Sequence, residues 1–274
     1  MKIPCPAHVA RITFVTMDTA EVLALFDRQI RRDYPGDDPA DLHEQVDGVV
    51  RQVGAGNGWC AVLWSDLDED TADAAIAAQV RYFGGLGREF EWKLYSHDHP
   101  ADLGERLLKA GLVPEDSEAL MVAEIASLPT EPVLPEGVRI ERVTDAAGVR
   151  LMTEARDAAF ERPSPLWEQH LLRQLEQHPD ALAAIVVLAG DRPVCAARME
   201  FHQGTDFASL WGGGTVPEWR GKGIYKATVA WRTRLAAERG YRYLQVDASD
   251  DSRPILGRLG FERLSTTTPY NYEP

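Results

Sequence analysis

The segment Arg220-Gly221-Lys222-Gly223 combines two glycines and two cations directly ahead of a predicted helix. The first turn of a helix leaves its backbone N–H groups without partners, and the helix dipole places partial positive charge there. Glycines remove the side chains that would keep an anion away from those N–H groups. Because Arg220 and Lys222 add local positive charge, the segment predicts a site for a polyphosphate rather than for a lone carboxylate.

Spacing excludes two familiar phosphate loops. A Walker A loop has Ser or Thr after its Gly-Lys pair, whereas here Gly223 follows Lys222, and Val216 stands at the first glycine position. A dinucleotide-binding GxGxxG would need a glycine at Lys226. The segment therefore predicts a phosphate site of another kind.

Two carboxylates are candidates for binding or deprotonating an amine. Asp247, at the end of the predicted strand 241–248, is either a general base or amine-binding group or the N-cap of the following turn. Glu200 lies in the strand pattern 194–201 and faces either a groove or the solvent. The sequence leaves both alternatives open.

No metal centre is expected. His97 and His99 flank Asp98, but no third ligand follows at a useful spacing, so the segment predicts a solvated turn. The cysteines Cys5 and Cys60 and the third, Cys195, are far apart and form no CxxC pair, so we expect small apolar residues rather than disulfides.

The charge balance limits the partners. With 43 acidic and 29 basic side chains, the net charge of −14 repels phosphate backbones, so we expect no nucleic-acid partner. The apolar run 181–188 is far shorter than the roughly 20 residues that span a bilayer, so we expect no membrane partner. Prolines and charges break the N-terminal stretch 1–14 before a signal peptide could form, and we expect a cytoplasmic protein.

The elements that must position these residues alternate along the second half of the chain. Thr144 or Asp145 is expected to cap the first helix, and the turn 190–193 predicts a hairpin. The order predicts a mixed α/β fold. Strands are expected at 138–142, 181–189, 194–201, 207–211, 241–248 and from 261, and helices at 144–160, after Pro165, at 222–239 and at 252–258.

Two domains are expected in the 274 residues: 1–127 and 138–274, joined by the Pro-rich linker 128–137. Their sequences are weakly similar at an offset of 149 positions, which matches Gly111 with Gly260 and Asp98 with Asp247. The same offset places residues 71–74 on the phosphate segment. Because acidic residues crowd 66–70, this first copy is expected not to hold a polyphosphate.

The phosphate segment resembles motif A of the GNAT superfamily of acyl-CoA-dependent N-acyltransferases, Q/R-x-x-G-x-G/A. The resemblance extends over residues 138–274 and includes Val216-Pro217 before the loop and the Leu259-Gly260-Phe261 triplet. It implies a tandem GNAT-like fold, with a central, mostly antiparallel mixed sheet flanked by helices in each half and a degenerate first copy.

The resemblance also implies the site. Acetyl-CoA would be the co-substrate, with its pyrophosphate on the loop amides and its pantetheine between the fourth and fifth strands, which a β-bulge splays apart. Backbone amides near Val216 would form an oxyanion hole. Seven residues would bind the cofactor: Val216, Arg220, Gly221, Lys222, Gly223, Ile224 and Tyr225.

This sequence departs from the family at two positions. Tyr225 replaces the final Gly or Ala of the motif, so its ring must turn away from the pyrophosphate or pack over the cofactor. Leu256 stands where the family often has a tyrosine that protonates the leaving thiolate; Tyr270 or Tyr272 is a candidate replacement.

The activity implied is transfer of an acetyl group to a primary amine of a small molecule or peptide, with Asp247 and Glu200 as candidate catalytic carboxylates. The alternative is a non-catalytic CoA-binding sensor or scaffold, which the absent acid and the degenerate copy favour. We expect a monomer or a homodimer.

Overall fold

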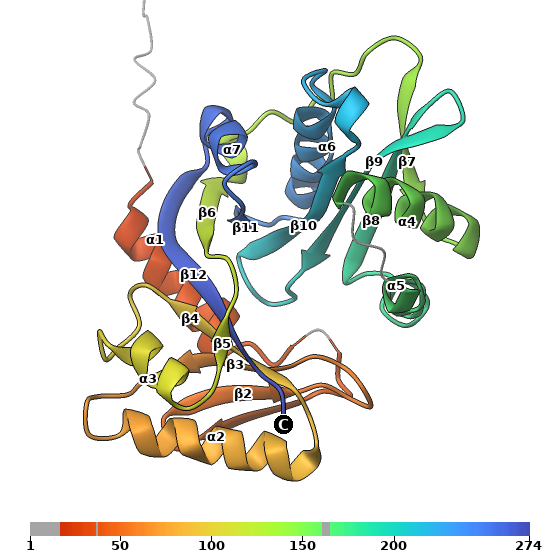
Figure 1. The fold of residues 1–274 in the computed structure, drawn as a ribbon. Helices are drawn as coiled ribbons and strands as arrows, with labels where there is room; N and C mark the ends of the chain where they lie inside the picture. The colour runs from red at the N-terminus through yellow and green to blue at the C-terminus, as the bar shows by residue number, and fades with distance from the viewer. Residues whose placement is uncertain (1–16, 37, 161–164) are drawn as a thin grey trace, which may run out of the picture.

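The elements of the second half form close to their predicted positions (Figure 1). The computed structural model describes residues 17–36, 38–160 and 165–274, so Cys5 and the N-terminal stretch 1–14 lie outside them. Asp145 caps the first of these helices, since its Oδ1 accepts a hydrogen bond from Gly148 N at 2.8 Å. The elements are β7 (Val138–Val143), α4 (Ala146–Phe160), α5 (Pro165–Gln177), β8 (Leu182–Ala189), β9 (Arg192–Phe201), β10 (Phe207–Thr215), η3 (Pro217–Trp219), α6 (Ile224–Glu238), β11 (Tyr243–Ala248), α7 (Arg253–Leu259) and β12 (Glu262–Tyr272).

The first half begins with a short helix and ends with a long buried strand. Asp18 caps the first helix through its Oδ1, which accepts hydrogen bonds from Ala20 N and Glu21 N. No helix among the described residues is long and apolar enough to cross a membrane. The elements are α1 (Thr19–Phe26), the π-helical η1 (Asp27–Arg32), β1 (Leu42–Val46), β2 (Val49–Val53), β3 (Cys60–Ser65), α2 (Ala72–Leu86), β4 (Phe90–Tyr95), α3 (Leu103–Lys109), β5 (Val113–Pro114), β6 (Glu118–Glu124) and η2 (Ile125–Ser127).

A single mixed sheet runs through the molecule. Its strand order is β1-β2-β3-β4-β12-β6-β11-β10-β9-β8-β7, with β5 beside β12. Among the described strands, only β3–β4 and β10–β11 pair in parallel. The predicted α/β class with a mostly antiparallel mixed sheet is confirmed.

The two halves exchange their last strands. β6 pairs with β11 of the second half, where Leu120 lies opposite Asp247, and β12 pairs with β4 of the first half, where Pro269 lies opposite Lys93. β6 and β12 also pair with each other at the centre of the sheet. The strand expected from residue 261 therefore exists, but it completes the sheet of the other half, which the sequence did not indicate.

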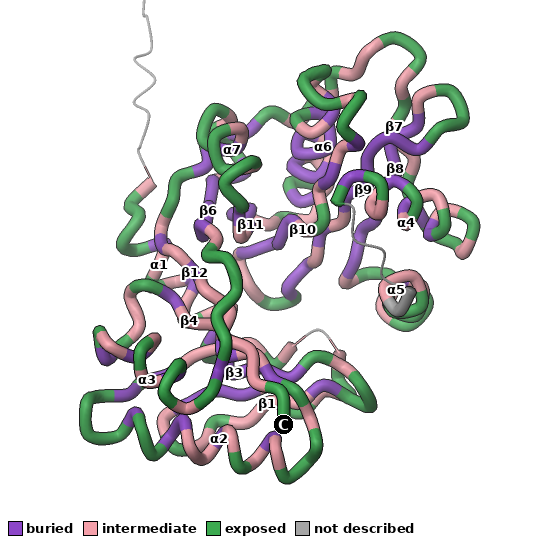
Figure 2. The backbone as a smooth tube through the Cα atoms, viewed as in Figure 1, coloured by how far each residue is buried: buried purple, intermediate pink, exposed green. Residues whose placement is uncertain are grey.

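Helices cover both faces of the central strands, and burial is concentrated in those strands (Figure 2). On one face α6 and α7 pack on Leu244 and Val246 of β11. On the other face α1 packs on Tyr243 of β11 and Phe207 of β10, and α4 covers β8 and β9 further along. Because strand side chains alternate between faces, Asp247 points to the α1 face.

The internal repeat consists of the units β3-α2-β4-α3 and β10-α6-β11-α7. α2 and α6 both have 15 residues, and α3 and α7 are followed by Gly111 and Gly260 in left-handed conformation, at φ +94° and +109°. When the two units are aligned at the first residues of α2 and α6, residues 68–71, rather than 71–74, correspond to the phosphate segment. The constant offset was wrong by three residues here because the loops of the two halves differ in length.

Candidate functional site

The phosphate segment forms an open helix entrance. Gly221 and Gly223 have left-handed φ angles of +73° and +82°, and nothing lies within 4 Å of where a Cβ would stand on either. No side chain caps the N-terminus of α6, which begins at Ile224. The first-turn N–H groups are therefore without a side-chain partner at a surface clear of side chains, which suits the phosphates that the sequence predicts there.

The two cations of the segment differ in role. Arg220 donates from Nε to Thr215 O at 3.1 Å and from Nη2 to Ala159 O at 3.0 Å, so it fastens the loop to β10 and α4. Lys222 is exposed, and its Nζ lies 4.2 Å from the centroid of the Trp219 ring. Lys222 is therefore the more available cation for a phosphate, while Arg220 holds the loop.

A gap opens between β10 and β11. Their parallel pairing ends at Ser209 and Gln245, although β10 continues to Thr215 and β11 to Ala248. The register of β10 against β9 shifts between Trp211 and Gly214, which is the bulge that the resemblance implies. Beyond Ser209 and Gln245 the two strands are therefore not paired with each other.

Three of the residues predicted to bind the cofactor make contacts within the protein. The N–H of Val216 donates to Val194 O at 3.0 Å, so in this arrangement it is not available to an oxyanion. Ile224 is buried in the apolar cluster behind the loop. The ring of Tyr225 turns inward beneath β10, since a Cβ on Gly213 would lie 2.9 Å from its Cε2.

Tyr225 also reaches across the gap. Burial raises the pKa of its phenol, and the proximity of Ser252, just before α7, opposes part of that rise. Leu256 is fully buried in the core beneath α7 and has no polar function. Tyr270 and Tyr272 pack in the core of the first half beside β4, so the structure does not bring either to the gap.

On the α1 face, Asp247 is nearly buried, with 3% of its side chain exposed, and its Oδ2 lies 2.6 Å from Lys93 Nζ. Lys93 projects from β4, so this ion pair joins the two halves across β12 and β6. Burial alone would lower the pKa of Lys93, but the charge of Asp247 and its hydrogen bond, together with the charges of Tyr95 and Glu91, outweigh burial and raise that pKa. The alternative reading of Asp247 as a helix cap is wrong, since its Oδ2 accepts from Lys93 and its Oδ1 has no partner.

Glu200 faces the same side of the sheet. It lies opposite Ser209, which pairs with Gln245, so it is separated from Asp247 by β10 and by about 10 Å of strand spacing. Arg198 Nη2 lies 3.5 Å from Glu200 Oε1, and both side chains are 19% exposed. The two predicted carboxylates share a face but do not touch.

Two further carboxylates, which the sequence reasoning missed, lie on this face. Burial, followed by the charge of Asp247, raises the pKa of Glu118 on β6 to about 7. Glu91 on β4 accepts a hydrogen bond from Trp59 Nε1 at 3.1 Å, and burial raises its pKa as well. Both residues belong to the first half, and only the exchange of strands brings them near Asp247.

Several buried polar atoms on this face have no hydrogen-bond partner. They are Gln245 Oε1 and Asp247 Oδ1 of β11, Trp211 Nε1 of β10 and Thr267 Oγ1 of β12. Thr267 lies opposite both Tyr95 and Glu118, which places it on the same face as Lys93. Unpaired buried polar groups are rare in folded proteins, so these four atoms are available to a polar ligand on this face.

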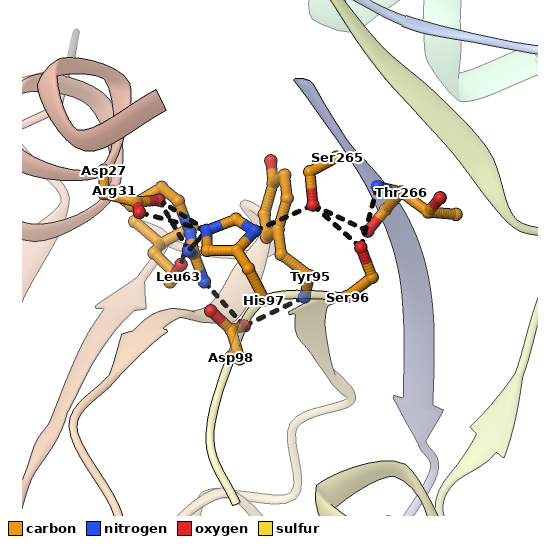
Figure 3. A network of polar contacts seen from close by, with 9 residues as sticks. All are labelled: Asp27, Arg31, Leu63, Tyr95, Ser96, His97, Asp98, Ser265 and Thr266. Carbon is orange, nitrogen blue, oxygen red and sulfur yellow. Dashed lines mark hydrogen bonds and ion pairs between the residues drawn. The ribbon is translucent and has the colours of Figure 1, made fainter. Parts of the chain in front are cut away.

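The first half has a matching gap, which its own side chains fill (Figure 3). Pairing of β3 with β4 ends at Val62 and Trp92, and Arg31 donates to the next carbonyl, Leu63 O, at 3.0 Å. Arg31 also pairs with Asp27 at 2.7 Å and with Asp98 at 2.8 Å, and its Cζ lies 4.0 Å from the Tyr95 centroid.

The predicted solvated turn at residues 97–99 is wrong for two of its members. His97 Nδ1 lies 2.7 Å from Ser265 Oγ of β12, and its Nε2 lies 3.0 Å from Asp27 Oδ2 (Figure 3). The side chain of Asp98 is 4% exposed, because Arg31 neutralises it. Among the described residues, no group of three or more His, Cys, Asp or Glu is placed to hold a metal ion.

The helix entrance of the first half is also closed to anions. Asp68 Oδ1 accepts hydrogen bonds from Asp70 N at 3.1 Å and from Thr71 N at 2.9 Å. Residues 70 and 71 immediately precede α2, just as residues 222 and 223 immediately precede α6, so these N–H groups occupy equivalent positions. A carboxylate therefore already occupies the place at which the second half presents open glycines.

Comparison with solved structures shows the same architecture. A GCN5-related N-acetyltransferase from Kribbella flavida superposes with a TM-score of 0.65 at 17% identity, covering 93% of this chain and 96% of that chain. A tandem GNAT protein from the clavulanic acid biosynthesis pathway gives 0.59 at 15% identity, with coverages of 92% and 93%. A conserved protein of unknown function from Staphylococcus epidermidis gives 0.64 at 16% identity, with coverages of 84% and 92%.

No protein-family model matches the sequence, and no curated protein does. At the identities found, the solved structures show the fold alone, and that fold is the tandem GNAT fold predicted from the sequence.

Proposed function

We propose that the protein is an acetyl-CoA-dependent N-acetyltransferase that acts on a primary amine of a small molecule or peptide. One observation carries the proposal: the gap between β10 and β11 has the open entrance of α6 on one side and the buried carboxylate Asp247 on the other. With an acyl carrier in this gap, its phosphates would lie at the entrance of α6 and its acyl group would meet an amine on the face of Asp247.

The residues of the second half fit acetyl-CoA. Gly221, Gly223 and Lys222 would hold its pyrophosphate, and the edges of β10 and β11 beyond Ser209 and Gln245 would hold its pantetheine. When bound, it supplies a thioester carbonyl as the electrophile. Tyr225 would have to leave the gap for pantetheine to pass, because its ring now lies against Gly213.

The amine must lose a proton before it attacks. At pH 7 an amine with a pKa of about 10.4 is free base in roughly one molecule in 2,500, a handicap near 4.6 kcal/mol. Glu118, whose pKa burial raises to about 7, is a suitable acceptor for that proton. Asp247 is better suited to hold the cation, since it already binds the ammonium of Lys93.

Leu256, at the position where the resemblance implies an acid, is buried in the core and cannot protonate the leaving thiolate. A thiolate has a pKa of about 8.5 and can leave unprotonated or take a proton from water. The absence of an acid at this position agrees with direct transfer to the amine.

An assay of thioester consumption tests the proposal. The chain is incubated with acetyl-CoA alone and with a panel of cationic, neutral and acidic amines, and acetylated product is identified by mass spectrometry. Amine-dependent consumption supports the enzyme. Calorimetric titration with CoA is expected to give one site per chain, because Asp68 closes the entrance in the first half.

A non-catalytic CoA-binding protein is the second candidate. Tyr225 in the gap, the hydrogen-bonded Val216 N–H and the buried Leu256 all favour it. It predicts stoichiometric CoA binding with no thioester consumption for any amine of the panel. We further propose that the protein works as a monomer or homodimer in the cytoplasm, without a nucleic-acid or membrane partner.

A further inference from the structure

Lys93 is held on the α1 face by a single hydrogen bond. Its Nζ donates to Asp247 Oδ2 at 2.6 Å, and the structure gives it no second hydrogen-bond partner among the described residues. The other oxygen of the carboxylate, Asp247 Oδ1, is buried without a partner. An ammonium has three N–H donors, so the pair leaves donors and an acceptor unused at one point of the face.

The surroundings carry more negative than positive charge. Glu118 and Glu91 lie near the Lys93–Asp247 pair, and Lys93 is the cation that faces them. Trp211 adds an aromatic surface, with its ring centroid 5.6 Å from Lys93 Nζ. The ammonium of Lys93 thus lies in a site with carboxylates and an indole, which are groups that bind alkylammonium ligands.

Arg31 in the first half is an internal cation that several contacts hold in place. Arg31, with 3% of its side chain exposed, pairs with Asp27 and Asp98, donates to Leu63 O and stacks on Tyr95. Lys93 is 17% exposed, has one hydrogen-bond partner among the described residues, Asp247, and reaches it across β12 and β6 with a flexible side chain. Arg31 is therefore fixed by several hydrogen bonds, whereas Lys93 is held by one hydrogen bond and a longer contact with the Trp211 ring, and we infer that a ligand can exchange with it.

We propose that Lys93 fills a cation subsite with its own ammonium and that a ligand with a primary ammonium on an unbranched alkyl chain displaces it and pairs with Asp247. This deepens the proposed function and rests on it, because the subsite faces the gap through which the acetyl group would arrive. The side chain of Lys93 is then a specificity-determining placeholder, and acceptors that resemble it are preferred over amino sugars and acidic amines. Thr267 Oγ1, on the same face, is also buried without a hydrogen-bond partner.

Chemical rescue tests the subsite without CoA. Lys93→Met removes the internal cation and leaves Asp247 buried and uncompensated, so its melting temperature is expected to fall. Addition of 1-butylammonium is expected to restore it, and the Kd for this probe is expected to be at least about 10-fold lower than for the wild-type chain. Butan-1-ol and butyrate are the uncharged and anionic probes of equal length and are expected to have no such effect.

Two further variants complete the design. Lys109→Met removes an exposed lysine of α3 and is expected to show no rescue. Lys93→Met combined with Asp247→Asn is expected to lose the response to 1-butylammonium. If Lys93→Met does not fold, side-chain ¹⁵N NMR of lysine-labelled wild-type protein replaces it: the Nζ signal of Lys93 is expected to move on titration with 1-butylammonium.

The proposal is overturned if 1-butylammonium binds Lys93→Met and the wild type equally, rescues no better than butan-1-ol, or leaves the Lys93 Nζ signal unchanged. These readouts are independent of the proposed activity. Rescue without amine-dependent thioester consumption would keep the cation subsite and refute the acetyltransferase, and turnover without rescue would do the opposite.

Discussion

Gly223→Asp tests the assignment of the phosphate segment most directly. Gly223 is the N-cap of α6 with φ +82° and open space around its Cβ position, so the new side chain causes no clash. Left-handed strain of about 1 kcal/mol is opposed by a capping gain of only a few tenths of a kcal/mol, so the free energy of unfolding is expected to fall by roughly 1 kcal/mol. A carboxylate about 4 Å from a phosphate costs roughly 1 to 4 kcal/mol, which is about a 5- to 1,000-fold loss of CoA affinity.

The matched control is Gly240→Asp, beyond the other end of α6. Gly240 has φ +83° and equally open space, so this variant has the same charge and the same backbone strain far from the segment. Calorimetric titration with CoA is expected to give wild-type affinity for Gly240→Asp and the stated loss for Gly223→Asp. Equal affinities in the two variants would refute the placement of the pyrophosphate at the entrance of α6.

Three other predictions follow from side chains described above. Tyr225→Ala is expected to bind CoA about 5- to 10-fold more tightly, because the ring that lies against Gly213 no longer has to leave the gap. Calorimetry checks this, and weaker binding would mean that the ring packs on the cofactor. Arg31→Met is expected to lower the free energy of unfolding, measured in urea, by about 3 to 5 kcal/mol, because the substitution leaves Asp98 buried and unpaired. A loss below about 1 kcal/mol would show that the network in Figure 3 does not stabilise the fold. Burial raises the pKa of Glu118 to about 7 in the folded chain, so the folded state holds this proton more tightly than the unfolded state, and the contribution of Glu118 to stability falls as the pH rises from about 4.5 to above 7. The melting temperature of Glu118→Gln is therefore expected to exceed that of the wild type at pH 8 and to equal it near pH 5. A difference in melting temperature that does not depend on pH would contradict the raised pKa.

The local parts of the fold and site were accessible from the sequence because local patterns determine them. The glycine pair before α6, the hairpin at Gly190 and the helices beside the repeated glycines all follow from residues a few positions apart. The partner of Asp247 was not accessible, since Lys93 belongs to the other half. Nothing local distinguishes a strand that pairs within its own half from one that crosses over.

The readings of Asp98 and His97 failed for the same reason. A His-Asp-His segment after a strand is typical of a solvated turn, and it becomes buried here only because Arg31 and Ser265 arrive from distant segments. Glu118 was missed because its raised pKa arises from burial among Asp247 and other groups that the sequence does not place together. The predicted division into 1–127 and 138–274 remains a prediction.

The position of β12 has a consequence for how the chain folds during synthesis. Residues 262–272 insert between β4 and β6, so the sheet of the first half stays open, with two unpaired strand edges, until the ribosome has made the whole second half. The nascent first half must therefore wait for its final strand with apolar edges exposed. Ribosome profiling combined with protease protection should show residues 17–127 becoming resistant only after residue 272 has left the exit tunnel.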